Sequence, residues 1–320
     1  MAQDYTYIVA RLRALEASMP DEAWFQRIAR TPAESLLAAI REFYRGFDTV
    51  DSLYDFEDGL EAGRKELLDL LGSLISDPDA TLFLRAGYDL DNLIHAYKAG
   101  SMGAPASMNG FGLVDPEVIG RAVTGVSTVD LPGYMKEFMD RLAALGDPAD
   151  PGLVEYEGEA LKWAFLYSVA PGRVAREYLS TKIGLTNIRM FIRLKRSPLR
   201  KQVPGSVWIE GGEIDRPTLA TLFREPEDEL HSYLAYTSDR GLAAMGLGTA
   251  TPLWKVEAIL DRQLLARIGE SSYRFFDMGP VLYHIELREK NEHLLRLLLT
   301  GKLNRLPDER ILEGVEAMTA

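Results

Sequence analysis

The chain of 320 residues contains no cysteine and only four histidines, and both shortages exclude kinds of chemistry. Without cysteine there is no disulfide, no thiol nucleophile and no thiolate metal site. The histidines, at positions 95, 231, 284 and 293, are too few and too scattered to suggest zinc binding or histidine-based acid–base catalysis. We therefore expect neither a metal nor a cofactor.

Basic residues are also in deficit. The chain carries 36 Lys and Arg against 48 Asp and Glu, a formal charge of −12. Binding to nucleic acid needs a basic surface that displaces counterions from phosphate, so no nucleic-acid partner is expected. Gly301-Lys302 is followed by Leu303, where a phosphate-binding loop has Ser or Thr, and no G-x-S-x-G elbow occurs. The sequence therefore predicts no catalytic residue.

Long apolar runs are missing as well. A membrane-spanning helix needs roughly 18 consecutive apolar residues, and the most apolar stretch, Leu294–Leu299, is short and contains Arg296. The first residues, Met1–Tyr5, lack the basic region and the apolar region with which a secretory signal begins. We expect a cytoplasmic protein that reaches a membrane only through a partner.

Helical periodicity dominates what is present, and strand patterns are scarce. Thr31-Pro32-Ala33-Glu34 predicts a helix that starts with Thr31 as its N-cap. The clearest strand candidate is the short segment Val207–Glu210 before two glycines. Apolar residues recur at helical spacing in further segments: Asp55–Ile75, Tyr134–Leu145, Leu161–Tyr178, Leu253–Ile268 and Val281–Leu299. We expect an all-α fold.

A weak internal repeat occurs in these helices. Three elements, Tyr88–Ile94, Ile183–Arg189 and Asn291–Arg296, align on three positions: Asn92, Asn187 and Leu294. Each lies in or opens an amphipathic helix that ends in basic residues: Lys98 in the first, Arg193 and Lys195 in the second, and Lys302 in the third. Each is followed by a further helix start, at positions 115, 215 and 307. The period predicts three helical units, residues 1–114, 115–214 and 215–320. The alternative is that amphipathic helices resemble one another by chance.

The repeated element can be explained by helix capping. Asp89 is a suitable N-cap, with Asn92 at the third position near the same free amides. In the second copy, Gly184 occupies the capping place. The Asn amide is also able to bridge two helices.

One stretch departs from the acidic whole, because no acid occurs between positions 189 and 201. Its basic residues are Arg189, Arg193, Lys195, Arg196, Arg200 and Lys201. The stretch is either a solvated helix end whose cations stabilise the helix dipole, or a docking patch for an acidic partner or anionic headgroups. These six residues are the candidate partner-binding residues.

Four segments together resemble the C-type subunit of the archaeal and bacterial V-type (A-type) ATP synthases, a family that includes the d-type subunit of vacuolar ATPases. Tyr7–Glu16 is similar to the opening motif Y-x-x-A-R-x-R-A-L-E, and Tyr88–Leu93 to Y-D-x-x-N-[IL]. Ile183–Arg189, with Arg193, is similar to I-D-L-x-N-I-[KR]-x-x-x-R. Glu289–Pro307 is similar to the closing motif E-I-x-N-[IL]-R-x-I-x-x-G-K-x-x-G-L-P.

The chain departs from the family pattern at a few positions. Gly184 stands where the family usually has Asp, Leu294 where it has Asn, and Arg305 where Gly is common. The sequence ends at Ala320 without the usual aromatic residue near the C-terminus.

The resemblance implies three similar helical bundles in a funnel-like, pseudo-threefold arrangement. It further implies a non-catalytic subunit of the central stalk of a proton- or sodium-translocating rotary ATPase. Such a protein is a socket that couples the D–F shaft to the membrane proteolipid ring. A helical adaptor without a rotary role is the alternative function. A third possibility is a metal-independent enzyme that uses carboxylates in a cleft between bundles.

Overall fold

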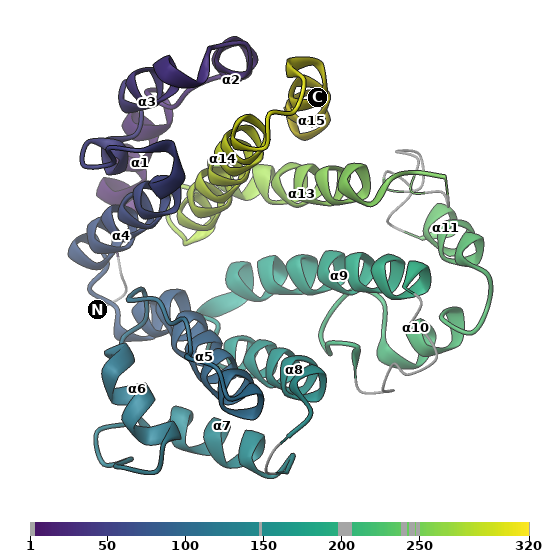
Figure 1. Cartoon of the computed structure of the whole chain (residues 1–320). Coiled ribbons are helices and arrows are strands. Elements are labelled where there is room, and N and C mark those ends of the chain that lie inside the picture. The colour runs from purple at the N-terminus through teal and green to yellow at the C-terminus, as the bar shows by residue number, and fades with distance from the viewer. Residues whose placement is uncertain are drawn as a thin grey trace. The chain divides into compact units, whose positions relative to one another are not determined.

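The structure is a computed structural model that describes residues 4–146, 149–197, 207–237, 242, 247 and 250–319 (Figure 1). Throughout these residues the regular elements are α-helices and short 3-10 helices, and no strand occurs. The expected all-α fold is therefore confirmed. The candidate strand at Val207–Glu210 is wrong, because this segment forms a buried turn that side-chain hydrogen bonds hold.

The chain divides into two compact units. Unit 1 combines Met1–Leu74 with Pro226–Ala320, and unit 2 is Ile75–Glu225. The three-unit division and the funnel arrangement stay predictions.

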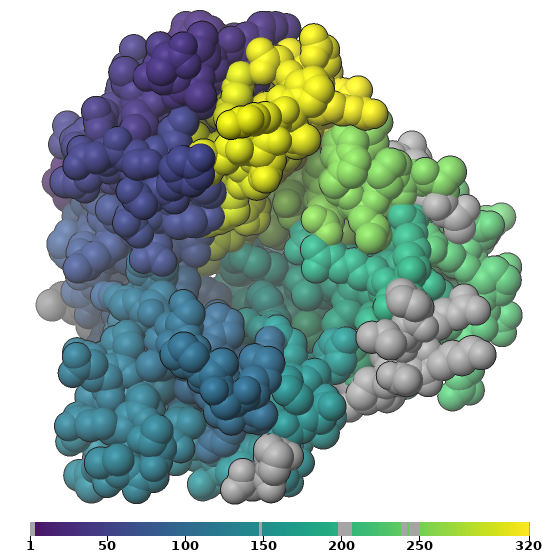
Figure 2. All heavy atoms as spheres, in the orientation of Figure 1, coloured from purple at the N-terminus to yellow at the C-terminus, as the bar shows by residue number. Residues whose placement is uncertain are grey.

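Unit 1 joins the two ends of the chain. Its elements are α1 (Thr6–Glu16), α2 (Glu22–Ala29), α3 (Ala33–Arg41), η1 (Arg45–Phe47), η2 (Leu53–Asp55), α4 (Phe56–Leu74), α11 (Glu227–Tyr236), α13 (Leu253–Gly269), η5 (Glu270–Tyr273), α14 (Gly279–Leu303) and α15 (Asp308–Thr319). In both Figures 1 and 2 the purple N-terminal helices lie against yellow α15, and α15 contacts α2. One apolar cluster, with Trp24, Phe47 and Leu298 among its members, holds these segments together.

Unit 2 is built around α5 (Pro78–Met102). The other elements of the unit are α6 (Pro116–Val123), α7 (Gly133–Ala143), α8 (Pro151–Val169), α9 (Gly172–Arg196) and α10 (Arg216–Leu222). Helix α5 packs along α8, and α6 and α7 cover it from the side in Figure 1. Leu90, Ile119 and Phe138 belong to the apolar cluster that these helices bury.

Aspartate and proline set most helix starts in unit 2. Asp77, Asp115, Asp150 and Asp215 are the N-caps of α5, α6, α8 and α10, and each carboxylate accepts a hydrogen bond from a backbone N–H of the first turn. Each of these four helices also has proline at its first or second position, where no backbone donor is lost. The helix starts expected at positions 115 and 215 are confirmed.

Other sequence-based boundaries need correction. The helix expected over Leu161–Tyr178 is two helices, because the chain breaks at Pro171 and Gly172, where Gly172 has a φ of 81°. Thr31 does not cap α3, whose N-cap is Pro32. The Thr31 hydroxyl instead donates to the carbonyl of Arg27 in the preceding helix.

The end of α14 explains one departure from the family pattern. Arg305 has a φ of 55°, a left-handed conformation that favours glycine. Its N–H donates to the carbonyl of Lys302, and the N–H of Leu306 donates to that of Gly301. These two bonds form a Schellman motif, which usually ends on glycine. Arg305 therefore occupies a position that has the geometry of a glycine site.

Candidate functional site

Asn92 and Asn187 make the same contact in unit 2. The Asn92 side chain donates to the carbonyl of Asn109 at 2.8 Å and accepts from the N–H of that residue at 2.9 Å. Asn187 makes the same two bonds with Ile209, at 2.8 and 2.9 Å. Each amide lies within a long helix and holds the loop that follows, because one side chain satisfies a buried donor and a buried acceptor together.

The helix-capping role that we expected for Asp89 is wrong. Asp89 lies eleven residues inside α5, fully buried, and its carboxylate accepts from the N–H groups of Leu113 and Val114 at 3.0 Å. The hydroxyl of Tyr134 donates to the same carboxylate at 2.8 Å. Burial raises the pKa of Asp89, against these three hydrogen bonds, which favour the charged form.

Gly184 occupies the position that Asp89 has in the first copy, and there the backbone of the loop at Gly212 contacts the backbone of the helix directly. A Cβ at Gly212 would lie 3.0 Å from the Cα of Gly184, whereas a Cβ at Gly112 would lie 1.9 Å from the Oδ1 of Asp89. The two loops therefore both approach the helix through a glycine. In the first copy the loop rests on a carboxylate, and in the second it rests on the helix itself.

The third repeat position does not share this contact. Leu294 is buried in the apolar cluster of unit 1 and has no amide with which to hold a loop. Asn291, three residues earlier, is buried, and its amide nitrogen lies 3.8 Å from the sulfur of Met19.

The basic stretch lies at the C-terminal end of α9. Arg189, Arg193, Lys195 and Arg196 belong to the helix, whereas Arg200 and Lys201 lie outside the described residues. Arg193 is exposed and Arg196 is partly exposed. The basic charge lies at the end of the helix that carries the negative pole of its dipole.

Lys195 is held in place at this end of α9. Its ammonium group donates to the carbonyl of Glu225 and lies 4.9 Å from the ring centroid of Phe223. Phe223 also packs edge-on against Phe191, so the lysine is part of a small aromatic cluster. Lys195 therefore has a structural role besides its charge.

The basic residues at the ends of the other two repeated helices are ion-paired. Lys98 donates to Glu155 on the neighbouring α8, and Lys302 donates to Asp308 at 2.7 Å at the start of α15. Both pairs join helix ends within one unit. They favour a structural role for these two lysines.

An exposed aromatic segment precedes α14, and sequence reasoning missed it. Tyr273, Phe275 and Phe276 are 76, 52 and 84% exposed. The Arg13 guanidinium lies 5.8 Å from the Tyr273 ring centroid and donates to the carbonyl of Ser272. Three exposed aromatic side chains within four residues are typical of a surface that a partner covers. The only signal in the sequence is that these three aromatic residues lie close together.

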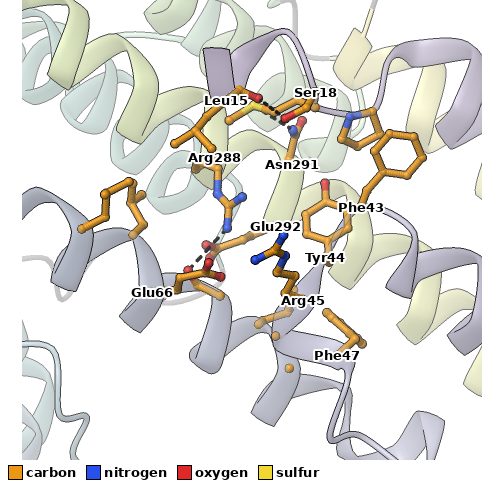
Figure 3. A pocket seen from close by; sticks show the side chains of 18 of the residues that line it. Leu15, Ser18, Phe43, Tyr44, Arg45, Phe47, Glu66, Arg288, Asn291 and Glu292 are labelled. Atoms are coloured by element: carbon orange, nitrogen blue, oxygen red, sulfur yellow. Dashed lines mark hydrogen bonds between the residues drawn. The ribbon is translucent and has the colours of Figure 1, made fainter. Parts of the chain in front are cut away.

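A cavity of about 460 Å³ lies in unit 1 between α1, the turn of residues 43–47, α4 and α14 (Figure 3). Glu292 is buried in its wall and accepts from Arg64, with the Arg64 Nε at 3.1 Å. Burial raises the pKa of Glu292, while Arg64 acts in the opposite direction. The second acid of the lining, Glu66, is exposed, so the cavity does not bring two buried carboxylates together.

Neither a metal-binding group nor a membrane-spanning helix occurs in the described part of the chain. Its His, Asp and Glu side chains form no group of three or more that is placed to hold a metal ion. No helix in these same residues has both the length and the apolarity that crossing a bilayer requires.

The fold class is thus all-α, and its distinctive features are the helix-to-loop contacts of unit 2 and the exposed aromatic segment of unit 1. A family model described as ATP synthase (C/AC39) subunit matches residues 8–314. The chain belongs to this family of V/A-type ATP synthase subunits, as its four ordered motifs indicated. Membership gives it a place in an ATP synthase complex. No curated protein matches the chain.

Proposed function

We propose that this protein is the non-catalytic rotor component that couples the D–F shaft to the proteolipid ring. It lies at the periphery of the membrane, which it reaches through the ring. The observation that carries the proposal is the family match over residues 8–314, nearly the whole chain.

The physical properties of both units support this role. A part that carries torque must be stiff, and stiffness comes from closely packed helices. In unit 2, buried Asn and Asp side chains also hold the connecting loops to the long helices. In unit 1, the exposed aromatic residues Tyr273, Phe275 and Phe276 offer a surface for a partner.

Binding to the two expected partners tests the role. The purified chain should bind both a D–F pair and the detergent-solubilised proteolipid ring. Binding to neither would contradict the proposal and favour a helical adaptor without a rotary role.

We further propose that the basic end of α9 contacts an acidic partner surface. Complementary charges at the rim of an interface mainly increase the rate of association and select the partner. Arg193 and Arg196 carry the argument, because Arg193 is exposed and Arg196 is partly exposed.

Reversing this charge should weaken assembly. We expect the double variant Arg193→Glu/Arg196→Glu to bind the D–F pair or the ring about tenfold more weakly at low salt, with unchanged circular dichroism. The matched control is Arg173→Glu/Arg176→Glu, which makes the same charge change on exposed residues at the other end of α9. Equal binding by both double variants would show that the position of the charge is irrelevant.

A further inference from the structure

The cavity of unit 1 has the size and the walls of a small-molecule site. Its volume of about 460 Å³ falls in the range of about 300–1,000 Å³ that ligand pockets occupy. Apolar side chains form much of the lining: Leu15, Met19, Pro20, Phe43, Phe47, Leu60, Leu67 and Leu70. Figure 3 shows the polar residues Arg288, Asn291 and Glu292 entering from α14.

Three arginines line the cavity: Arg11 and Arg45 are exposed, and Arg288 is partly buried. Among the described residues, Arg11 and Arg45 have no hydrogen-bond or ion-pair partner, and Arg288 donates only to the carbonyl of Gly63, at a long 3.4 Å. By contrast, the neighbouring Arg64 is fixed on Glu292, and Arg41 donates to two backbone carbonyls. In Figure 3 the guanidinium groups of Arg45 and Arg288 point toward one another.

Two polar atoms in the wall are buried without a hydrogen-bond partner. They are the hydroxyl of Tyr44 and the Nε of Arg288. Tyr44 is only 6% exposed, and in Figure 3 its hydroxyl points toward Asn291. Its ring lies 5.9 Å from the Arg288 guanidinium carbon. Because a buried donor without a partner destabilises a protein, the pair suggests that a ligand completes the site.

The charges of the lining favour an anion. Glu292 already forms an ion pair with Arg64, and Glu66 is exposed on α4. The lining therefore carries three arginines, of which Arg11 and Arg45 are exposed like Glu66 and Arg288 is partly buried, in a chain whose formal charge is −12. Arginine presents a planar fork that matches a carboxylate, and the aromatic walls suit an apolar body.

We propose that this cavity binds a small organic carboxylate. The Arg288 guanidinium holds the carboxylate with help from Arg45, and the Tyr44 hydroxyl donates to it. The apolar body of the ligand packs against Phe47 and Leu67. A bound ligand joins α14, α4 and the turn of residues 43–47, and so stabilises unit 1.

Titration calorimetry on the full chain tests this with 3-phenylpropionate as the probe. From its few heavy atoms we expect a dissociation constant of about 1 mM. The neutral analogue 3-phenylpropanol, which has the same apolar body, should bind at least about tenfold more weakly. Inorganic phosphate is the third probe and reports on charge alone.

The variants separate the carboxylate contact from folding. Arg288→Gln should lower the affinity for 3-phenylpropionate about tenfold or more, and Tyr44→Phe severalfold. Arg288→Lys keeps the charge but loses the fork, so it should also weaken binding. Arg310→Gln changes an exposed residue of α15 outside the cavity lining, so it is the matched control and should bind as the wild type does. Circular dichroism verifies that each variant is folded.

Selective binding of 3-phenylpropionate that Arg288→Gln abolishes supports the proposal. Equal affinity for the acid and the alcohol would overturn it, because the cavity would then recognise only the apolar body. Binding of inorganic phosphate without 3-phenylpropionate, or no binding of either anion up to about 10 mM, would overturn it as well.

Discussion

Single residues in unit 2 fix how closely loops approach helices. Gly112 lies against Asp89, which also accepts hydrogen bonds from the next two residues of the loop, Leu113 and Val114. There is no space for a side chain between the loop and this carboxylate. The loop and the carboxylate therefore constrain each other, and Gly112 is the position at which this can be tested.

Replacing Gly112 by alanine should destabilise the protein. The new Cβ would lie 1.9 Å from the Asp89 Oδ1, so the loop or the carboxylate must move. We expect this movement to lower the unfolding free energy by about 1–3 kcal/mol, as measured by urea titration. Gly100→Ala is the control, because Gly100 is an exposed residue of α5 with nothing within 4 Å. It should stabilise the same unit by about 0.5–1 kcal/mol. Equal stability of Gly112→Ala and the wild type would refute the close contact.

A second residue-scale prediction concerns the left-handed Arg305. Arg305→Gly should raise the unfolding free energy by about 1 kcal/mol, because glycine adopts a φ of 55° without strain. Arg310→Gly makes the same substitution inside α15 and should lower the unfolding free energy by about 1 kcal/mol. The two changes must have opposite signs in urea unfolding, and a loss of stability in both would contradict the assigned backbone conformation.

At the scale of elements, α4 and α14 are joined by a two-pronged ion pair. The Arg296 guanidinium donates to both carboxylate oxygens of Glu57, at 2.8 and 2.7 Å. The hydrogen bonds from Arg296 hold the pKa of Glu57 below its ordinary value, although partial burial acts in the opposite direction. Glu57 is about half exposed, so water screens the pair and its contribution is small.

The lowered pKa gives this pair a defined pH dependence. Between the folded pKa and the ordinary value of about 4.3, the unfolded chain binds more protons at Glu57 than the folded chain does. The stabilisation is therefore fully present above about pH 4.3 and is lost as the pH falls through the folded pKa.

The variant Glu57→Gln should follow that dependence. Its deficit in unfolding free energy against the wild type should be largest near neutral pH and should shrink on acidification. Glu61→Gln, on the same helix and without an ion pair in the described part of the chain, is the control and should show no such trend. A deficit for Glu57→Gln that grows toward low pH would contradict the sign of the pKa shift.

The sequence predicted helix starts better than helix breaks. The starts at Asp115 and Asp215 depend on a local pattern of aspartate and proline, which few other conformations satisfy. The break at Gly172 is less visible, because the apolar spacing continues across it. Asp89 was misplaced although the same pattern, Asp77 followed by Pro78, marks the start of α5 twelve residues earlier.

Contacts between distant segments were the harder part of the site to predict. The Asn92 and Asn187 positions were found from the repeat, but their loop partners lie 17 and 22 residues away, and only the fold brings them together. The cavity of unit 1 combines residues from 11 to 70 with residues from 284 to 292, so no local pattern indicates it. The basic stretch at Arg193 was visible because its charge is contiguous.

At the scale of the whole molecule, the loop contacts support the predicted repeat in its first two copies. The segment held by Asn92 ends in Gly112 and the N-cap Asp115, and the segment held by Asn187 ends in Gly212 and the N-cap Asp215. Both segments therefore follow the same order, from the residue held by Asn to the glycine and the N-cap Asp, which helical periodicity alone does not require. The third predicted position does not make this contact, because Leu294 joins the apolar cluster of unit 1.

The central claim is that this chain couples a rotary shaft to its ring. The most direct test mixes the purified chain with the purified D–F pair and measures the mass of the product by light scattering after size-exclusion chromatography. We predict a single species with one copy of each of the three proteins. Separate elution of the chain and the D–F pair, with both proteins loaded at high concentration, would contradict the account.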